Sequence, residues 1–311
     1  MNPSLEDKNP LGVSFAICTY NGNQMLIQAI QSIRERVHTQ FPYEIVVVNN
    51  NSTDETHHLI QEYIKKTKST HIKYDVETHQ GLVYARRKAT QKAAYRYISF
   101  IDDDNFILSK EWVDRVIDIF ENHPNVGIIG VKTIGEYEIP PPSWFYTIQQ
   151  AYAVGEQYHT SGFTDSHNRN FVWGAGMSIR KILLENFFQD KKIDAFLLTG
   201  RHADKTTAGE DGLISLYVLH RGFQLFYAPE LQLIHYIKKN RLTLAYARSL
   251  SKNIGYSQMI LRYHPFNKHT PHKIKACIYS FIKLIQCILQ RRLILMYYHI
   301  GQLKYFIKHF V

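Results

Sequence analysis

Three consecutive aspartates, Asp102, Asp103 and Asp104, follow the apolar run "YISFI" of residues 97–101. Carboxylates crowded at the end of a strand repel one another unless a cation neutralises them. Their hard oxygen ligands suit Mg²⁺ or Mn²⁺, and such ions usually keep substrate phosphates in their coordination shell. The cluster therefore predicts a divalent metal site, with a solvated loop that caps a helix as the alternative.

A second acidic pair, Glu210 and Asp211, follows Gly209 and opens a helical pattern that runs to Arg221 and stops at Gly222. Carboxylates in the first turn of a helix are ordinarily favourable partners of the helix dipole. Taken alone, the pair is therefore explained by its favourable interaction with the helix dipole.

The elements that must position these acids alternate along the chain. Short β-branched runs alternate with helical patterns, and Ser52 with Glu55 forms a capping-box pattern that predicts a helix start. Strands are predicted at 13–18, 44–48, 97–101 and 126–131, and helices at 23–37, about 52–66, about 83–96 and 110–120. This alternation predicts an α/β fold with a doubly wound, mostly parallel sheet, whose ligands bind beyond the carboxyl ends of the strands. The aspartates and the "TYNG" and "NNNS" segments should therefore line one rim.

Absent motifs, the cysteine spacing and the N-terminal segment narrow the possible function classes and the expected location. The sequence contains neither GxGxxG nor GxxxxGK[ST], so a dinucleotide dehydrogenase and a P-loop nucleotidase both lose their main signature. The three cysteines lack metal-ligand spacing, which indicates a reducing compartment. The polar, acid-containing start "MNPSLEDKNPLG" is no secretory signal, and we expect a cytoplasmic protein.

Charge is divided unevenly. All 27 acidic residues lie at or before Glu230, whereas residues 231–311 carry 14 Lys and Arg and no acid. This asymmetry indicates a boundary near residues 230–240 and an anionic partner for the tail, either a membrane surface or a nucleic acid.

Seven ordered motifs, found between about residues 11 and 245, resemble those of the family 2 glycosyltransferases with a GT-A type fold. They are "AICTYNG", "VVVNNNSTDET", "GLVYARRKA", "FIDDDN", "WGAGMSIRK", "GEDGLISLYVLHRG" and "LIHYIKKNRLT". The resemblance implies metal-dependent, inverting transfer of a sugar from a nucleotide-sugar, a UDP-sugar in first place, to a hydroxyl of a glycan or lipid-linked acceptor. The process would be polysaccharide or surface-glycan biosynthesis.

The same resemblance implies a donor site. Four residues match positions that hold the nucleotide in that family, and Arg86 matches a basic position near the pyrophosphate, where a solvated helix charge is the alternative. The four are Thr19, Asn21, Asn50 and Asp54. The family often has Asp-Asp or Asp-Asn where this chain has Asn49-Asn50.

The aspartates match the family's DxD motif. Asp102 would contact the ribose or sugar, Asp104 would ligate Mn²⁺ or Mg²⁺, and Asp103 is the middle residue of this nucleotide-sugar site, with no separate role. His235 resembles the histidine that completes the metal shell, although a lone histidine is more often structural.

The acidic pair acquires a role from the same resemblance. Asp211 matches the general base that deprotonates the acceptor hydroxyl, and Glu210 helps to place the acceptor.

Two irregular segments are candidates for further walls of the site. The stretch between residues 134 and 171 contains "PPPSWF" and several tyrosines that could form an acceptor wall. The loop of residues 197–211 brings Arg201, His202 and Lys205 close to the departing diphosphate, unless it is an ordinary surface loop.

We therefore divide the chain into a catalytic domain, residues 1–240, and a basic, aromatic-rich helical extension, residues 241–311. Cations mixed with Ile, Leu, Phe and Tyr are typical of helices in an anionic membrane interface, so we expect a peripheral protein at the cytoplasmic membrane face. The alternative is that the apolar face packs on the catalytic domain.

Nucleic acid is a less favoured partner, because no nucleic-acid motif accompanies the charge. A sugar-nucleotide nucleotidyltransferase and a non-catalytic binding module on the same fold are the alternative functions.

Overall fold

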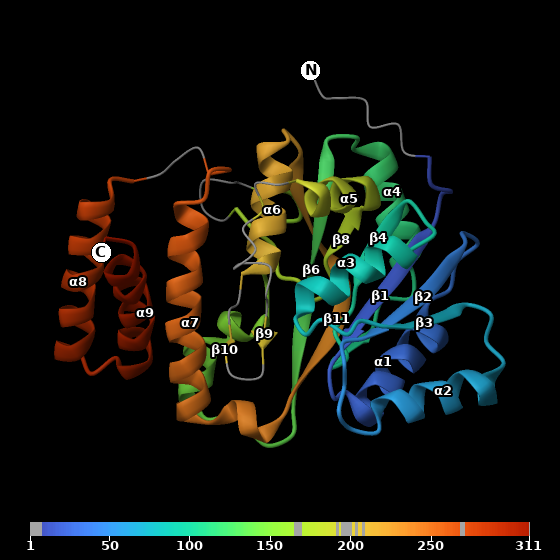
Figure 1. Cartoon of the computed structure of the whole chain (residues 1–311), viewed down its shortest axis with the longest axis horizontal. Coiled ribbons are helices and arrows are strands. Elements are labelled where there is room, and N and C mark those ends of the chain that lie inside the picture. Colours follow the sequence, from blue (N-terminus) through green and yellow to red (C-terminus); the bar gives the residue numbers. More distant parts are fainter. Residues whose placement is uncertain are drawn as a thin grey trace.

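The computed structural model describes residues 8–164, 170–190, 193, 201–202, 205–206, 209–267 and 271–310. A central sheet with helices on both faces lies beside a group of C-terminal helices (Figure 1). The strands of the sheet are β1 (Val13–Thr19), β2 (Tyr43–Asn49), β3 (Ile72–Val76), β4 (Tyr97–Phe100), β5 (Asn105–Ile107), β6 (Val126–Tyr137), β7 (Gly162–Phe163), β8 (Ser178–Arg180) and β11 (Gln224–Ile237).

The strands run in the order β3-β2-β1-β4-β8-β6-β11-β5, and β7 also pairs with β11. Strands β1 to β4 are parallel, β6 is parallel to β11, and the short strands β5, β7 and β8 are antiparallel to their neighbours. Strands β9 (Arg201–His202) and β10 (Lys205–Thr206) form a separate antiparallel pair. The predicted mostly parallel α/β sheet is confirmed.

Helices cover both faces of this sheet because its strands are apolar on both sides. In β1, Phe15 and Ile17 belong to one buried cluster, with α1, α2 and α4, whereas Ala16 belongs to the other, with α3, α5 and α6. These helices are α1 (Asn23–Arg36), α2 (Thr56–Thr67), α3 (Leu82–Lys92), α4 (Trp112–Asn122), α5 (Lys181–Gln189) and α6 (Glu210–His220). The doubly wound arrangement predicted from near-continuous apolar strands is therefore confirmed.

Two predicted helices have wrong boundaries. The capping box was expected to start α2 near Ser52, but the helix begins at Thr56 and its N-cap, Glu55, makes no side-chain capping bond. The Ser52 hydroxyl instead accepts a hydrogen bond from the backbone N–H of Asn21. Helix α3 ends at Lys92 rather than near Arg96, because the next residue is already extended.

The C-terminal extension consists of three helices, α7 (Leu244–Arg262), α8 (Lys273–Leu289) and α9 (Leu293–Phe310). The Thr243 hydroxyl caps α7 by accepting a hydrogen bond from the N–H of Tyr246. Among the described residues, the short 3₁₀ segments η1 (Ser143–Thr147), η2 (Gln149–Tyr152) and η4 (Lys239–Leu242) precede α7. Among the residues the structure describes, no helix is both long enough and apolar enough to cross a membrane.

Helices α7 and α9 pack backbone to backbone. A Cβ added to Gly255 would overlap the carbonyl of Tyr298, and one added to Gly301 would overlap the carbonyl of Lys252. Glycine is needed at both positions because the helices approach too closely for a side chain. Helix α8 packs on α9 and forms the outermost layer at that end of the molecule (Figure 1).

Candidate active site

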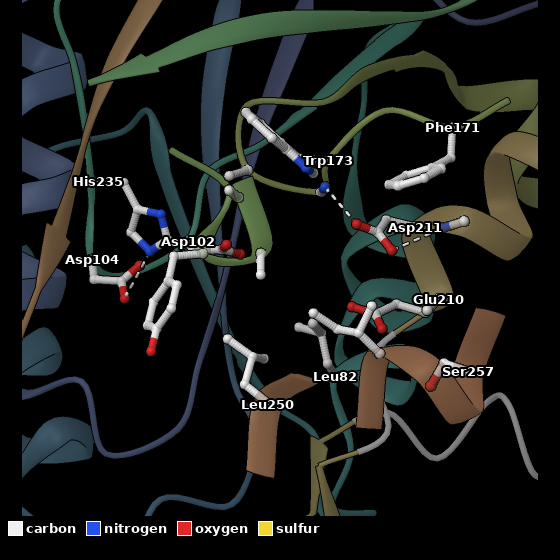
Figure 2. A pocket seen from close by; sticks show the side chains of 18 of the residues that line it. Leu82, Asp102, Asp104, Phe171, Trp173, Glu210, Asp211, His235, Leu250 and Ser257 are labelled. Atoms are coloured by element: carbon white, nitrogen blue, oxygen red, sulfur yellow. Dashed lines mark hydrogen bonds and ion pairs between the residues drawn. The ribbon is translucent and has the colours of Figure 1, made fainter. Parts of the chain in front are cut away.

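A pocket of about 710 Å³ lies at the carboxyl ends of β1, β2 and β4, as the doubly wound sheet predicts. The ends of the strands and their loops line it together with side chains of α7 and α9. Two acidic groups face each other across it, Asp104 with His235 on one side and Glu210 with Asp211 on the other, and Asp102 lies on the side of the first group (Figure 2).

Asp103 belongs to the scaffold of this rim as well as to its lining. Its carboxylate accepts a hydrogen bond of 2.5 Å from the Thr19 hydroxyl at the end of β1. A Cβ added to Gly22 would lie 2.5 Å from the same carboxylate, so the turn after β1 needs glycine there. Loss of hydration, followed by repulsion from Asp104 and Asp102, raises the pKa of Asp103 to about 7. Asp103, for which no separate role was predicted, thus connects the ends of β1 and β4.

Asp104 and His235 are neighbours because β5 pairs with β11 directly beside them. The His235 Nε2 lies 3.5 Å from Asp104 Oδ2, and the same oxygen accepts a hydrogen bond of 3.0 Å from Arg241 Nη1. A carboxylate oxygen and an imidazole nitrogen at this separation can share one divalent ion whose remaining ligands come from substrate phosphates and water. No group of three or more His, Cys, Asp or Glu side chains that could hold a metal ion occurs among the described residues, so Asp104 and His235 would supply two protein ligands. Arg241 already donates a hydrogen bond to the same Asp104 oxygen.

Arg86 connects the two acidic groups. Its guanidinium is 2% exposed and lies 3.5 Å from Glu210 and 4.0 Å from Asp102. Burial lowers the pKa of Arg86, but the nearby Glu210 and Asp102 carboxylates outweigh it and leave the pKa above its usual value. The guanidinium also stacks over Phe100, with its central carbon 4.8 Å from the ring centroid. The alternative of a solvated helix charge is therefore wrong.

Backbone N–H groups hold the side chain of Asp211 in the first turn of α6. Its carboxylate accepts hydrogen bonds from the N–H groups of Gly174, at 3.1 Å, and Gly212, at 2.8 Å. Loss of hydration and the neighbouring Glu210 carboxylate raise the pKa of Asp211 to about 6, against the opposing effect of Arg86. A carboxylate with this pKa, in a pocket and fixed in orientation, is suited to accept a proton near neutral pH.

The predicted nucleotide-binding residues separate into two groups. Thr19 and Asn50 line the pocket, but the Asn50 amide is already bonded to the carbonyls of Glu77 and His79 and to the N–H of Gly81. Asn50 therefore holds the loop before α3.

Asn21 and Asp54 are not among the residues that line the described pocket. The Asn21 side chain accepts a hydrogen bond from the N–H of Thr53, and Asp54 accepts one from the N–H of Thr56. Both side chains order the turns around the rim.

Part of the segment that was expected to form an acceptor wall lines the pocket. Residues 148 and 150–153 and Phe171 line the pocket, whereas Phe145 is buried in a separate apolar cluster. The predicted loop of residues 197–211 lies largely outside the described residues, and nothing is described of the side chains of Arg201, His202 and Lys205.

Sequence reasoning missed the contribution of the extension. Arg241 from η4 lines the pocket together with side chains of α7 and α9. These are Leu250, Ser251, Ile254, Ser257, Gln258, Leu261, Leu295 and Tyr298. The signal for Arg241 was present, since it lies within the motif "LIHYIKKNRLT", from which only His235 was selected. The α7 side chains had no motif to reveal them.

The family model described as Glycosyl transferase family 2 matches residues 14–188, more than half of the chain. The chain belongs to glycosyl transferase family 2.

Two curated relatives of this family 2 chain are named as glycosyltransferases, one for teichuronic acid biosynthesis and one for poly(ribitol-phosphate). It is 31% identical over 93 residues to the putative teichuronic acid biosynthesis glycosyltransferase TuaG of Bacillus subtilis (strain 168), covering 30% of this chain and 36% of TuaG. It is 26% identical over 129 residues to the poly(ribitol-phosphate) beta-N-acetylglucosaminyltransferase TarS of Staphylococcus aureus (strain Mu50), covering 41% of this chain and 22% of TarS. The alignments thus span little more than a third of TuaG and less of TarS.

A solved structure of residues 1–349 of S. aureus TarS in complex with UDP-GlcNAc has the same fold as this family 2 chain. The TM-score is 0.58 at 16% identity, and the match covers 89% of this chain and 73% of that one. The predicted GT-A type fold is confirmed by this likeness and by the family match.

Proposed function

We propose that the protein transfers a sugar from a nucleotide-sugar, a UDP-sugar in first place, to a hydroxyl of a glycan or lipid-linked acceptor in surface-polysaccharide synthesis. The observation that carries the proposal is that both acidic groups line one pocket, and that the buried guanidinium of Arg86 lies 4.0 Å from Asp102 and 3.5 Å from Glu210. One group suits a leaving diphosphate and the other suits an attacking hydroxyl. Relatives named for teichuronic acid and poly(ribitol-phosphate) support the polymer class.

Asp211 is the proposed general base. Its backbone hydrogen bonds fix the carboxylate in the pocket, and its raised pKa gives it useful basicity near neutral pH. The acceptor hydroxyl would lie against Asp211, lose its proton to that carboxylate and attack the anomeric carbon opposite the departing nucleotide. Direct displacement of this kind inverts the anomeric configuration.

The donor diphosphate is proposed to lie near Arg86, Asp102 and Asp104. Arg86 supplies a buried positive charge at this wall, and Asp104 with His235 would hold Mn²⁺ or Mg²⁺. A bound divalent ion would stabilise the negative charge of the leaving diphosphate as a Lewis acid. Glu210 lies 3.5 Å from Arg86 and is proposed to help place the acceptor relative to the donor.

The acceptor is proposed to approach along α7. Leu261 of this helix lies beside Gly212, the residue after the proposed base, where an added Cβ would lie 2.6 Å from its Cδ1. Apolar Leu250 and Ile254 with polar Ser257 and Gln258 give a wall that can contact both a sugar and an apolar carrier.

The proposal is tested by nucleotide release from UDP-, GDP- and dTDP-sugars, with Mn²⁺, Mg²⁺ or a chelator present. We expect metal-dependent release from UDP-sugars, lost in Asp104→Ala. Asp211→Asn should reduce transfer by about 10²–10⁴-fold while donor binding, measured by calorimetry, persists.

Surface variant Lys110→Gln, which is outside the pocket lining, serves as the control and should retain activity. No metal-dependent release from any donor, with both acidic variants indistinguishable from the original chain, would refute the proposal.

A further inference from the structure

Helix α8 exposes most of its large apolar side chains. A helix that only packs against its own protein would bury them. The face toward α9 consists of small buried residues, Ala276, Ser280 and Cys287. Ser280 also donates a hydrogen bond of 3.1 Å to Gln302 of α9. Apart from half-buried Leu284, the large apolar side chains of α8 are exposed, so most of them lie outside this interface.

The outward face is a continuous stripe of large apolar residues, here called the α8 stripe. Its members are spaced at three or four residues, as a single helical face requires, and each is between 42% and 77% exposed. The stripe consists of Ile274, Ile278, Phe281, Ile282, Ile285, Ile288 and Leu289. A contiguous exposed surface of this kind marks a contact site rather than scattered surface hydrophobics.

The charged residues around the stripe are all cationic. Lys273 and Lys275 are exposed at its start, and Arg291 and Arg292 are exposed just past its end. No acidic residue occurs anywhere after Glu230. A second copy docked through the same stripe would bring these cations against each other, whereas an anionic surface would be attracted.

We propose that α8 docks on an anionic lipid surface, with its stripe among the acyl chains and the flanking Lys and Arg at the phosphate level. This narrows the expected membrane contact from the whole extension to one helix, because α7 and α9 are used by the pocket and by each other. A helix with an apolar face and basic ends lies in the plane of the interface and does not span it. Docking does not depend on the proposed transfer reaction.

The test uses the full chain and vesicles of phosphatidylcholine, alone or with phosphatidylglycerol, in co-sedimentation. We expect binding to the anionic vesicles that weakens with salt. Ile278→Glu/Ile285→Glu should weaken it by at least about tenfold, because two carboxylates would enter the acyl region. The matched control is Phe41→Glu/Ile139→Glu, which makes the same change at exposed positions on the sheet domain and should bind as the original chain does.

Two further measurements separate the possible outcomes. Lys273→Gln/Lys275→Gln should weaken binding to anionic vesicles while helix content, by circular dichroism, is unchanged. Failure of the original chain to bind anionic vesicles, or equal binding by the stripe variant, overturns the proposal. A dimer in buffer that the stripe variant dissociates, with no vesicle binding, assigns the stripe to a second copy and also overturns it. Nucleotide release in solution reports on the transfer reaction separately, because Ile278 and Ile285 are outside the pocket lining.

Discussion

At the scale of single residues, Arg86 sets the electrostatics of the pocket. It is the buried cation 3.5 Å from Glu210, and its charge opposes the rise in the pKa of Asp211. If Asp211 is the base, it must be ionised to act. We therefore expect activity to rise with pH through about 6 and to be lost below it, where the Asp211 carboxylate binds a proton.

Replacing Arg86 with methionine should move this acid limb to higher pH. Without the positive charge, the negative form of Asp211 is less favoured, so the pKa of Asp211 rises further. The measurement is the pH profile of kcat/KM for nucleotide release. The same variant should lose about 3–5 kcal/mol of unfolding free energy, because Glu210 is left as an uncompensated charge. An acid limb that stays in place would show that Asp211 is not the titrating base.

Replacing Arg241 with methionine should raise the affinity for Mn²⁺ in the absence of nucleotide. Electron paramagnetic resonance of Mn²⁺ measures this affinity. The guanidinium lies 3.0 Å from Asp104 Oδ2, and its removal frees that oxygen from a competing cation. Lys239→Met is the matched control, since Lys239 is an exposed cation of the same turn that pairs with Glu138 at 3.8 Å. Unchanged or weaker Mn²⁺ affinity in Arg241→Met alone would contradict Asp104 as a metal ligand.

At the scale of elements, the crossing of α7 and α9 depends on glycine. Gly255→Ala would place a methyl group against the Tyr298 carbonyl, so one helix must move. We expect a loss of about 1–3 kcal/mol in unfolding free energy. Donor affinity should fall as well, because Ser257 and Gln258 are adjacent on the same helix and line the pocket. Chemical denaturation and calorimetry check the two effects, and Lys304→Ala, at an exposed position of α9, should show neither.

The elements show how far sequence reasoning extends and why it stops. Strands β1, β2, β4 and β6 were predictable because β-branched runs buried on both faces leave a strong local signal. The start of α2 was not predictable. The Ser52 hydroxyl accepts a hydrogen bond from the N–H of Asn21, which is distant in the sequence, and no local pattern reveals that contact. The acidic groups were found from their motifs. The α7 wall was missed, since its side chains reach the pocket only through tertiary packing.

At the scale of the whole molecule, the site is not contained in the first 240 residues. Arg241 and the α7 and α9 side chains complete the pocket, although the sequence division placed them in an extension. A chain ending at residue 240 should therefore lose donor affinity by more than tenfold, roughly the loss of several pocket contacts, and should expose the apolar surface that α7 covers. Calorimetry with UDP and light scattering measure the two consequences. A soluble truncated chain with unchanged affinity would show that the extension is dispensable.

The close backbone contact of α7 and α9 joins two surfaces for which we propose different ligands. Helix α7 lines the pocket through Ser257 and Gln258, and α9 contacts α8 on its other side. Thermodynamic linkage then applies: if lipid docking changes donor affinity by some factor, donor binding must change lipid affinity by the same factor. Titrating vesicles with and without UDP would therefore measure the coupling from either direction.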